Sequence, residues 1–291
     1  DDNSGYSADS GVQTIQRAVE LTQGWLPIMV MSSTYVNGDV TLEDLTIYRG
    51  DGCVNNMLIV NDTLNLRNVT IDGRSLPTQS DSTVTTRPDG GYLLMVYGGN
   101  ATINIYDGTV LRNNTDTAVY GMQMGSAVNM YGGTIETDDN YGIYAYRGSA
   151  VNLYGGTIIS GSYAIASYGS DVLIDGATIE GLYGVWAKSF TDSAFDFPAS
   201  ITMRSGTITA EDTCIRSEGA AVDIQGGSIR GAGSFDLMPS DRSDDLADLT
   251  LGAEAAVSGD VYMEYTTETE GPTIFVEEGF TVDEPIYRSE E

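Results

Sequence analysis

Histidine is absent from this 291-residue chain, and lysine occurs once, at Lys188. Without imidazole there is no His-ligated zinc site, no Ser-His-Asp or Cys-His catalytic group and no histidine pH switch. Basic residues are scarce in general: 13 stand against 42 acidic ones, and the net charge is −29. Because binding to phosphates requires clustered lysines and arginines, this balance excludes nucleic acid as a partner and argues against anionic membrane surfaces.

Cysteines and long apolar runs are also few. The two cysteines, Cys53 and Cys214, do not make a disulfide framework, and we expect Cys214 to be a buried structural thiol distant from Cys53. No run approaches the roughly 18 apolar residues of a membrane-spanning helix, so membrane insertion is not expected. A hydrophobic fraction of 41% nevertheless predicts a folded chain rather than a disordered acidic tail.

What the chain does contain is an internal repeat. Eight segments align without gaps and start 21 to 39 residues apart: VTLEDLTI from Val40, LNLRNVTI from Leu64, INIYDGTV from Ile103, VNMYGGTI from Val128, VNLYGGTI from Val151, VLIDGATI from Val172, ITMRSGTI from Ile201 and VDIQGGSI from Val222. Such a period, with strand patterning and no helix between the segments, predicts a parallel β-helix.

The chemistry inside each repeat supports this fold. Apolar first and third residues alternate with polar ones, as in a strand with one buried face. Glycines follow at a corner that favours positive φ, and a Thr/Ser–Ile/Val pair comes next. A second strand precedes each segment, with a predicted inward row at Val119, Ile143, Ile165, Val185 and Ile215.

We therefore predict an all-β, right-handed parallel β-helix (solenoid) with an N-terminal helical cap. Residues 1–31 are expected to form the cap helix and first strand, with Ser10 as the start of a capping box, and residues 32–230 to form the coils. After Ile229 the repeat degrades, so we expect a loop from Arg230 to Asp248 within an acidic C-terminal segment or cap at residues 231–291.

The Val-Asn-x-Tyr-Gly-Gly-Thr-Ile repeats resemble the right-handed parallel β-helix (pectate-lyase-like) superfamily, and are especially similar to solenoid stretches of adhesin-type bacterial surface proteins. This resemblance covers roughly residues 12–230. It implies an extracellular or cell-surface location. It leaves function open, because one fold carries enzymes, adhesins and inert stalks.

One motif pair bears on an enzymatic alternative. Asn114-Thr115-Asp116 is followed one coil later by Asp138-Asp139, which is similar to motifs of polygalacturonase-type glycoside hydrolases. Carried over, Asp139 would be the general acid, with Asp116 and Asp138 activating water. The family's Gly-His-Gly and Arg-Ile-Lys motifs are missing, and Asn and Asp are ordinary turn residues at such corners, so we favour no catalytic residue.

An acidic loop offers a second candidate site. Asp241, Asp244, Asp245 and Asp248 place four carboxylates within eight residues. Oxygen ligands on a loop suit Ca²⁺, but no EF-hand or nonapeptide spacing is present. The two interpretations are a calcium site and a solvated acidic loop. We expect the protein to require no cofactor, and Ca²⁺ is the one candidate ion.

Outward aromatic residues are the most suggestive feature. They fall into rows on successive coils: Tyr106, Tyr131 and Tyr154; Tyr120, Tyr144 and Trp186; and Tyr141, Tyr163 and Tyr183. Aromatic rows can bind sugar rings or proteins, or can simply stack to stabilise the solenoid. Two insertions, residues 72–92 and 189–200, interrupt the period, and Asn61, Asn68, Asn100 and Asn113 lie in Asn-x-Ser/Thr sequons.

From these features we expect a non-catalytic extracellular or cell-surface solenoid that acts as a stalk, filament subunit or adhesin module. Its expected partners are further copies of itself or surface glycans bound through the tyrosine rows. The alternative is a polysaccharide-degrading enzyme, either a polygalacturonase-like hydrolase or a lyase, that uses the clustered aspartates.

Overall fold

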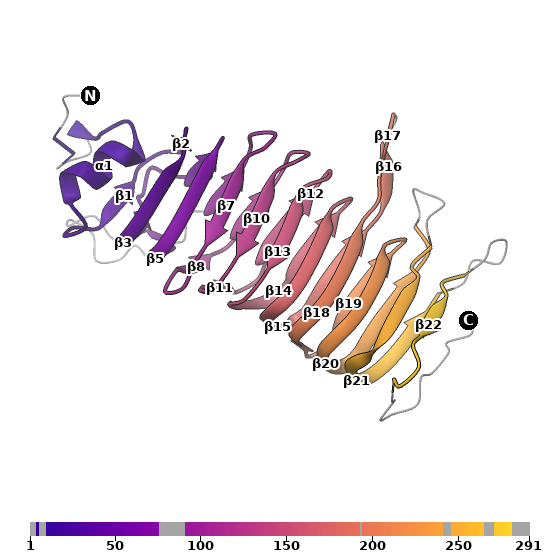
Figure 1. Ribbon diagram of the computed structural model, residues 1–291. Helices are drawn as coiled ribbons and strands as arrows, with labels where there is room; N and C mark the ends of the chain where they lie inside the picture. Colours follow the sequence, from indigo (N-terminus) through magenta and orange to yellow (C-terminus); the bar gives the residue numbers. More distant parts are fainter. Residues whose placement is uncertain are drawn as a thin grey trace.

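The computed structural model describes residues 4–5, 10–75, 91–192, 194–240, 246–264 and 271–280. The chain is a parallel β-solenoid of about 9 turns with one short N-terminal helix. Figure 1 shows the strands stacked side by side along one axis, with the helix at the N-terminal end. The predicted fold class is confirmed.

The elements follow in chain order: α1 (Ile15–Thr22), β1 (Ile28–Val30), β2 (Thr34–Val36), β3 (Val40–Arg49), β4 (Leu58–Val60), β5 (Thr63–Ser75), β6 (Leu94–Val96), β7 (Thr102–Ile105), β8 (Val110–Asn114), β9 (Val119–Gly121), β10 (Ala127–Met130), β11 (Thr134–Thr137), β12 (Ile143–Tyr146), β13 (Ala150–Leu153), β14 (Thr157–Tyr168), β15 (Asp171–Lys188), β16 (Phe190–Asp192), β17 (Phe195–Phe197), β18 (Ser200–Ala210), β19 (Thr213–Glu218), β20 (Ala221–Met238), β21 (Leu249–Met263) and β22 (Ile274–Val276).

Each full coil contributes to three parallel ladders. The first ladder contains the start of each repeat, for example β7–β10–β13–β15. The second contains the Thr–Ile pairs, for example β8–β11–β14–β15. The third runs through β2, β4, β6, β9, β12, the end of β14, the end of β15, β19, the end of β20 and the end of β21. A hairpin of β16 and β17 is antiparallel and projects from the solenoid (Figure 1).

The core lies inside these ladders. The predicted inward row of the third ladder pairs in register, and Val119, Ile143, Ile165, Val185 and Ile215 are all 0% exposed. Stacking at the strand spacing of about 4.8 Å places each of these β-branched side chains directly on the next. The continuous row is therefore one of the apolar contacts that hold neighbouring coils together.

Polar residues on the outside of the first ladder also stack. Asn104 Nδ2 donates to Asn65 Oδ1, Asn129 Nδ2 to Asn104 Oδ1 and Asn152 Nδ2 to Asn129 Oδ1, each at 2.9 Å. At the following corner Gly133 has φ +81°, and a Cβ there would lie 2.6 Å from the Thr109 carbonyl oxygen. The corner glycine is therefore required for both its backbone angle and its close contact.

The cap helix begins later than expected. The predicted capping box at Ser10 is wrong: Thr14 is the N-cap and its side chain accepts a hydrogen bond from the Arg17 N–H at 3.2 Å. The helix ends at Thr22, with Gln23 in the left-handed conformation as C-cap. Ile15 is 2% exposed and joins the solenoid core, and the partly buried Ala18 and Val19 pack against it, so the apolar side of the short helix covers the end of the core.

The predicted loop from Arg230 to Asp248 is also wrong in its first part. Strand β20 continues to Met238, and its last portion pairs with β19 and β21 in the third ladder. Phe235, which is 0% exposed, takes the inward position held by Ile215 on the coil before. The coils therefore extend beyond residue 230. The repeat pattern did not reveal this coil, because an aromatic residue replaces the β-branched one at the inward position.

Both cysteines are free and buried, as expected for Cys214. Burial raises the pKa of the Cys214 thiol to about 11. Burial also raises the pKa of Cys53, although the Arg49 guanidinium opposes this shift. Neither thiol has the lowered pKa of a nucleophile.

Candidate binding face

Nine aromatic side chains lie next to one another on the outer surface of the third ladder. We define the aromatic face by these residues: Tyr92, Tyr120, Tyr141, Tyr144, Tyr146, Tyr163, Tyr168, Tyr183 and Trp186. All nine are half-buried, and each contacts at least one other ring of the set. Eight of the 18 tyrosines of the chain thus lie on one surface.

Strand register explains why these residues meet. Tyr120 pairs with Tyr144, Tyr144 with Ala166, and Ala166 with Trp186, so they form one row across four coils. The same row continues toward the N-terminus through Met95, Ile59 and Tyr35. Outward residues on seven successive coils are therefore uncharged and, Ala166 apart, large.

Tyr144 lies at the centre of the face. Its ring centroid is 5.1 Å from that of Tyr120, 5.5 Å from Tyr141, 5.4 Å from Tyr168 and 6.2 Å from Tyr146. Burial raises the pKa of Tyr120 to about 12 and raises the pKa values of Tyr144 and Tyr168 as well. The hydroxyls are therefore neutral at ordinary pH and can both donate and accept hydrogen bonds.

The sequence analysis found part of this face. It predicted the row of Tyr120, Tyr144 and Trp186 and the row of Tyr141, Tyr163 and Tyr183 as separate features, and the structure brings the two together. It missed Tyr92, Tyr146 and Tyr168. A signal was present for two of them, because Tyr146 and Tyr168 each follow an inward isoleucine by three residues.

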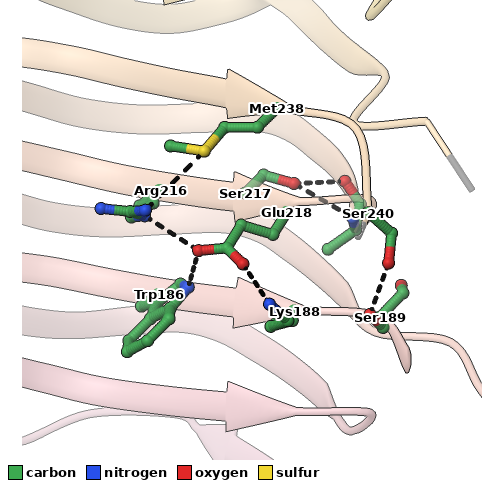
Figure 2. A network of polar contacts seen from close by, with 9 residues as sticks. Trp186, Lys188, Ser189, Arg216, Ser217, Glu218, Met238 and Ser240 are labelled. Carbon is green, nitrogen blue, oxygen red and sulfur yellow. Dashed lines mark hydrogen bonds and ion pairs between the residues drawn. The ribbon is translucent and has the colours of Figure 1, made fainter. Parts of the chain in front are cut away.

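A charged network closes the C-terminal end of the face. Glu218, which is 8% exposed, accepts hydrogen bonds from Trp186 Nε1 at 3.1 Å, Lys188 Nζ at 2.6 Å and Arg216 Nε at 3.1 Å. Figure 2 shows the four side chains converging from neighbouring strands. The Arg216 guanidinium also lies 5.5 Å from the centroid of the Trp186 ring. The uncharged row thus ends at Trp186, and the charged Arg216 takes the equivalent position on the next coil.

The β16–β17 hairpin borders the face on one side. Phe190 stacks on Tyr146 at 5.7 Å, and Phe197 stacks on Phe190 at 5.1 Å. Arg147 forms an ion pair with Asp192 of the hairpin and lies 5.1 Å from the Tyr146 ring. The predicted insertion at residues 189–200 is therefore attached to the aromatic face. The other predicted insertion falls largely on residues 76–90, outside the described residues.

The row of Tyr106, Tyr131 and Tyr154 is a separate feature. Its rings stack face to face at 5.1 and 5.2 Å, with interplanar angles of 13° and 14°, and Arg67 lies 3.8 Å over the Tyr106 ring. Tyr131 and Tyr154 remain 45% and 43% exposed. Because most ring faces contact one another, this row presents mainly edges to solvent.

The aspartates of the hydrolase-like motifs take part in turn structure. Asp116 Oδ1 accepts hydrogen bonds from the Thr117 N–H at 2.7 Å and from Asn140 Nδ2 at 3.2 Å. Asp138 and Asp139 are exposed in the turn that follows β11. These contacts account for Asp116 without catalysis, and a catalytic role for the three residues stays an untested alternative.

The predicted calcium loop falls mostly outside the described residues, which include Asp248 but not Asp241, Asp244 or Asp245. The Asp248 carboxylate accepts a hydrogen bond from the Thr273 N–H at 3.0 Å. Within the described ranges, no group of three or more histidine, cysteine, aspartate or glutamate residues has an arrangement that could hold a metal ion. The calcium expectation is not tested by this finding.

In comparisons with known proteins, no protein-family model, curated protein or solved structure matches the chain. In the part of the chain that the structure describes, no helix is both long enough and apolar enough to cross a membrane.

Proposed function

We propose that this chain is a non-catalytic, extracellular or cell-surface β-solenoid of the adhesin type, and that its aromatic face binds a glycan. The observation that carries the proposal is the aromatic face itself: nine rings joined by ring contacts on one surface of a molecule with a net charge of −29. Large contiguous apolar patches on a protein surface mark interaction or ligand-binding sites.

The chemistry of the face suits sugars. Tyrosine and tryptophan combine an apolar ring, which packs against the C–H face of a pyranose, with a polar group that can hydrogen-bond to its hydroxyls. The neutral phenols supply donors and acceptors without the desolvation penalty of a charge. A linear glycan lying along the solenoid axis would meet aromatic side chains on coil after coil.

The solenoid supplies length and rigidity. About 9 turns at roughly 4.8 Å per coil correspond to a rod of about 40 Å. Continuous inward rows and side-chain ladders hold neighbouring coils in register, so the binding face is carried on a stiff support. This combination of spacer and face supports an adhesin or stalk role and does not require catalysis.

Pull-down with insoluble cellulose, chitin and xylan tests the proposal. The informative variant is Tyr144→Ala with Tyr168→Ala, which removes the centre of the face. Tyr131→Ala with Tyr154→Ala is the matched control, since it removes the same number of tyrosines from the other row. Thermal melting of both variants establishes that they are folded.

We expect the parent protein to be retained by at least one polysaccharide, and the Tyr144/Tyr168 variant to bind about tenfold more weakly, which corresponds to roughly 1.4 kcal/mol. The control is expected to bind like the parent. Equal loss in both double variants, or no retention of the parent, would contradict the assignment of the binding site to the aromatic face.

A further inference from the structure

The charged network beside the aromatic face holds one ring in a defined position. Trp186 has its indole N–H bonded to Glu218 and its ring close to Tyr168, at 4.9 Å in an edge-on arrangement, and to Tyr163, at 5.2 Å. A partly buried indole N–H usually has a hydrogen-bond partner, and here the partner comes from the next coil of the solenoid. The indole plane is therefore set by a contact 32 residues away in sequence.

Glu218 is itself held firmly. Its two carboxylate oxygens accept from three donors on two neighbouring coils, and its side chain is only 11% exposed. Two of the donors carry charge, and one of them is the single lysine of the chain. Charge-assisted hydrogen bonds of this kind are short and strong, so Glu218 is a fixed support rather than a mobile surface acid.

The surroundings of this network are acidic overall. Lys188 pairs with Glu218, and Arg216 pairs with Glu218 and lies beside Asp236 of the next coil in register. Asp236 in turn lies near the carboxylates of Glu264 and Asp212. The pKa of Asp236 is raised above its ordinary value, first by burial and then by Glu264, Glu218 and Asp212, against an opposing effect of Arg216. This end of the aromatic face thus has a net negative potential.

We propose that Trp186 is the ligand-contacting ring at the C-terminal end of the aromatic face, that Glu218 is the positioning residue that fixes its indole, and that the carboxylates beyond it restrict the ligand to uncharged glycans. This inference rests on the proposed function. It adds a terminal contact, the residue that orients it and a preference between neutral sugars and uronic acids.

Fluorescence provides a readout of position that is independent of binding. The chain has two tryptophans, and Trp25 is 86% exposed, so Trp25→Phe leaves Trp186 as the only tryptophan with little effect on folding. In this background Glu218→Ala removes the hydrogen-bond acceptor, and Glu218→Gln keeps a side-chain carbonyl that can accept from the indole. Glu136→Gln, an exposed acid on β11, is the matched control.

The probes are cellohexaose, chitohexaose and hexagalacturonate, titrated at low and at high salt. We expect Glu218→Ala to shift Trp186 emission to the red, to increase its quenching by acrylamide and to weaken binding of the neutral hexasaccharide about tenfold. Glu218→Gln is expected to recover most of the emission and affinity, and Glu136→Gln to match the parent. Hexagalacturonate should bind more weakly than the neutral sugars at low salt, and the gap should narrow at high salt because screening weakens repulsion.

Several outcomes would overturn the inference. If the parent binds a neutral glycan but Glu218→Ala changes neither emission nor affinity, Glu218 does not position the Trp186 indole, while the proposed function stands. Preferential binding of hexagalacturonate would refute the restriction to uncharged ligands. If the parent binds none of the sugars, the proposed function fails and this inference falls with it.

Discussion

Replacing Phe235 by alanine tests whether the chain beyond residue 230 forms a true solenoid coil. Phe235 is 0% exposed and pairs with Ile215 on one side and Val261 on the other. Removing a buried phenyl ring loses its transfer free energy and leaves a cavity between two coils. We therefore expect Phe235→Ala to lower the free energy of unfolding by about 3–5 kcal/mol.

Urea unfolding followed by circular dichroism measures this loss. Phe195→Ala is the control, because Phe195 is 64% exposed on the β17 strand of the hairpin and its replacement should change stability by only about 0.5 kcal/mol. Hydrogen exchange adds a local measurement: the amides of β19, which pair with β20, should lose protection in Phe235→Ala. A loss below about 1 kcal/mol, with β19 still protected, would refute the assignment of residues 231–238 to a core strand.

Three further substitutions give tests of charge and catalysis. Burial raises the pKa of Asp72, but hydrogen bonds from Arg74 and Asn113 outweigh it and leave the pKa below its ordinary value. The carboxylate therefore stabilises the fold above its unfolded pKa and loses this effect as pH falls through the folded pKa. Asp72→Asn should destabilise by about 1–3 kcal/mol at pH 7, and melting curves should converge with the parent's in acid. Asp236 has the opposite sign: its raised pKa means that ionisation opposes folding, so Asp236→Asn should melt higher than the parent at pH 7, with the difference vanishing below the ordinary aspartate pKa. A lower melting point at pH 7 would contradict this. Finally, neither the parent nor Asp139→Asn should release reducing ends from polygalacturonate; release by the parent that Asp139→Asn abolishes would instead establish the hydrolase.

The fold could be predicted because equivalent residues recur in every repeat and stack on one another in the solenoid. Pairs such as Thr134–Ile135 and Thr157–Ile158 lie in register in the second ladder, and their spacing in the chain is enough to predict the stacking. Prediction failed where the pattern changed its residue types. In β21 the pair aligned with Ser228–Ile229 is Ala256–Val257, which no longer resembles the motif although it occupies the same place.

The binding face was harder to predict for a different reason. Tyr144 and Tyr168 belong to different rows of neighbouring coils, and their contact depends on how side chains lean across the sheet as well as on register. The bond between Trp186 and Glu218 joins two coils separated by the inserted hairpin. No periodicity relates such residues, so only the three-dimensional arrangement brings them together.

The contact between rings along the aromatic face also has an optical consequence. Tyr92 lies 4.6 Å from Tyr120, and the chain of contacts continues through Tyr144 and Tyr168 to Trp186. At these separations excitation energy passes from tyrosine to tryptophan faster than tyrosine emits. We therefore expect light absorbed by the tyrosines of the face to leave mainly as Trp186 emission, so that a molecule that moves one of these rings would change the fluorescence of a single residue.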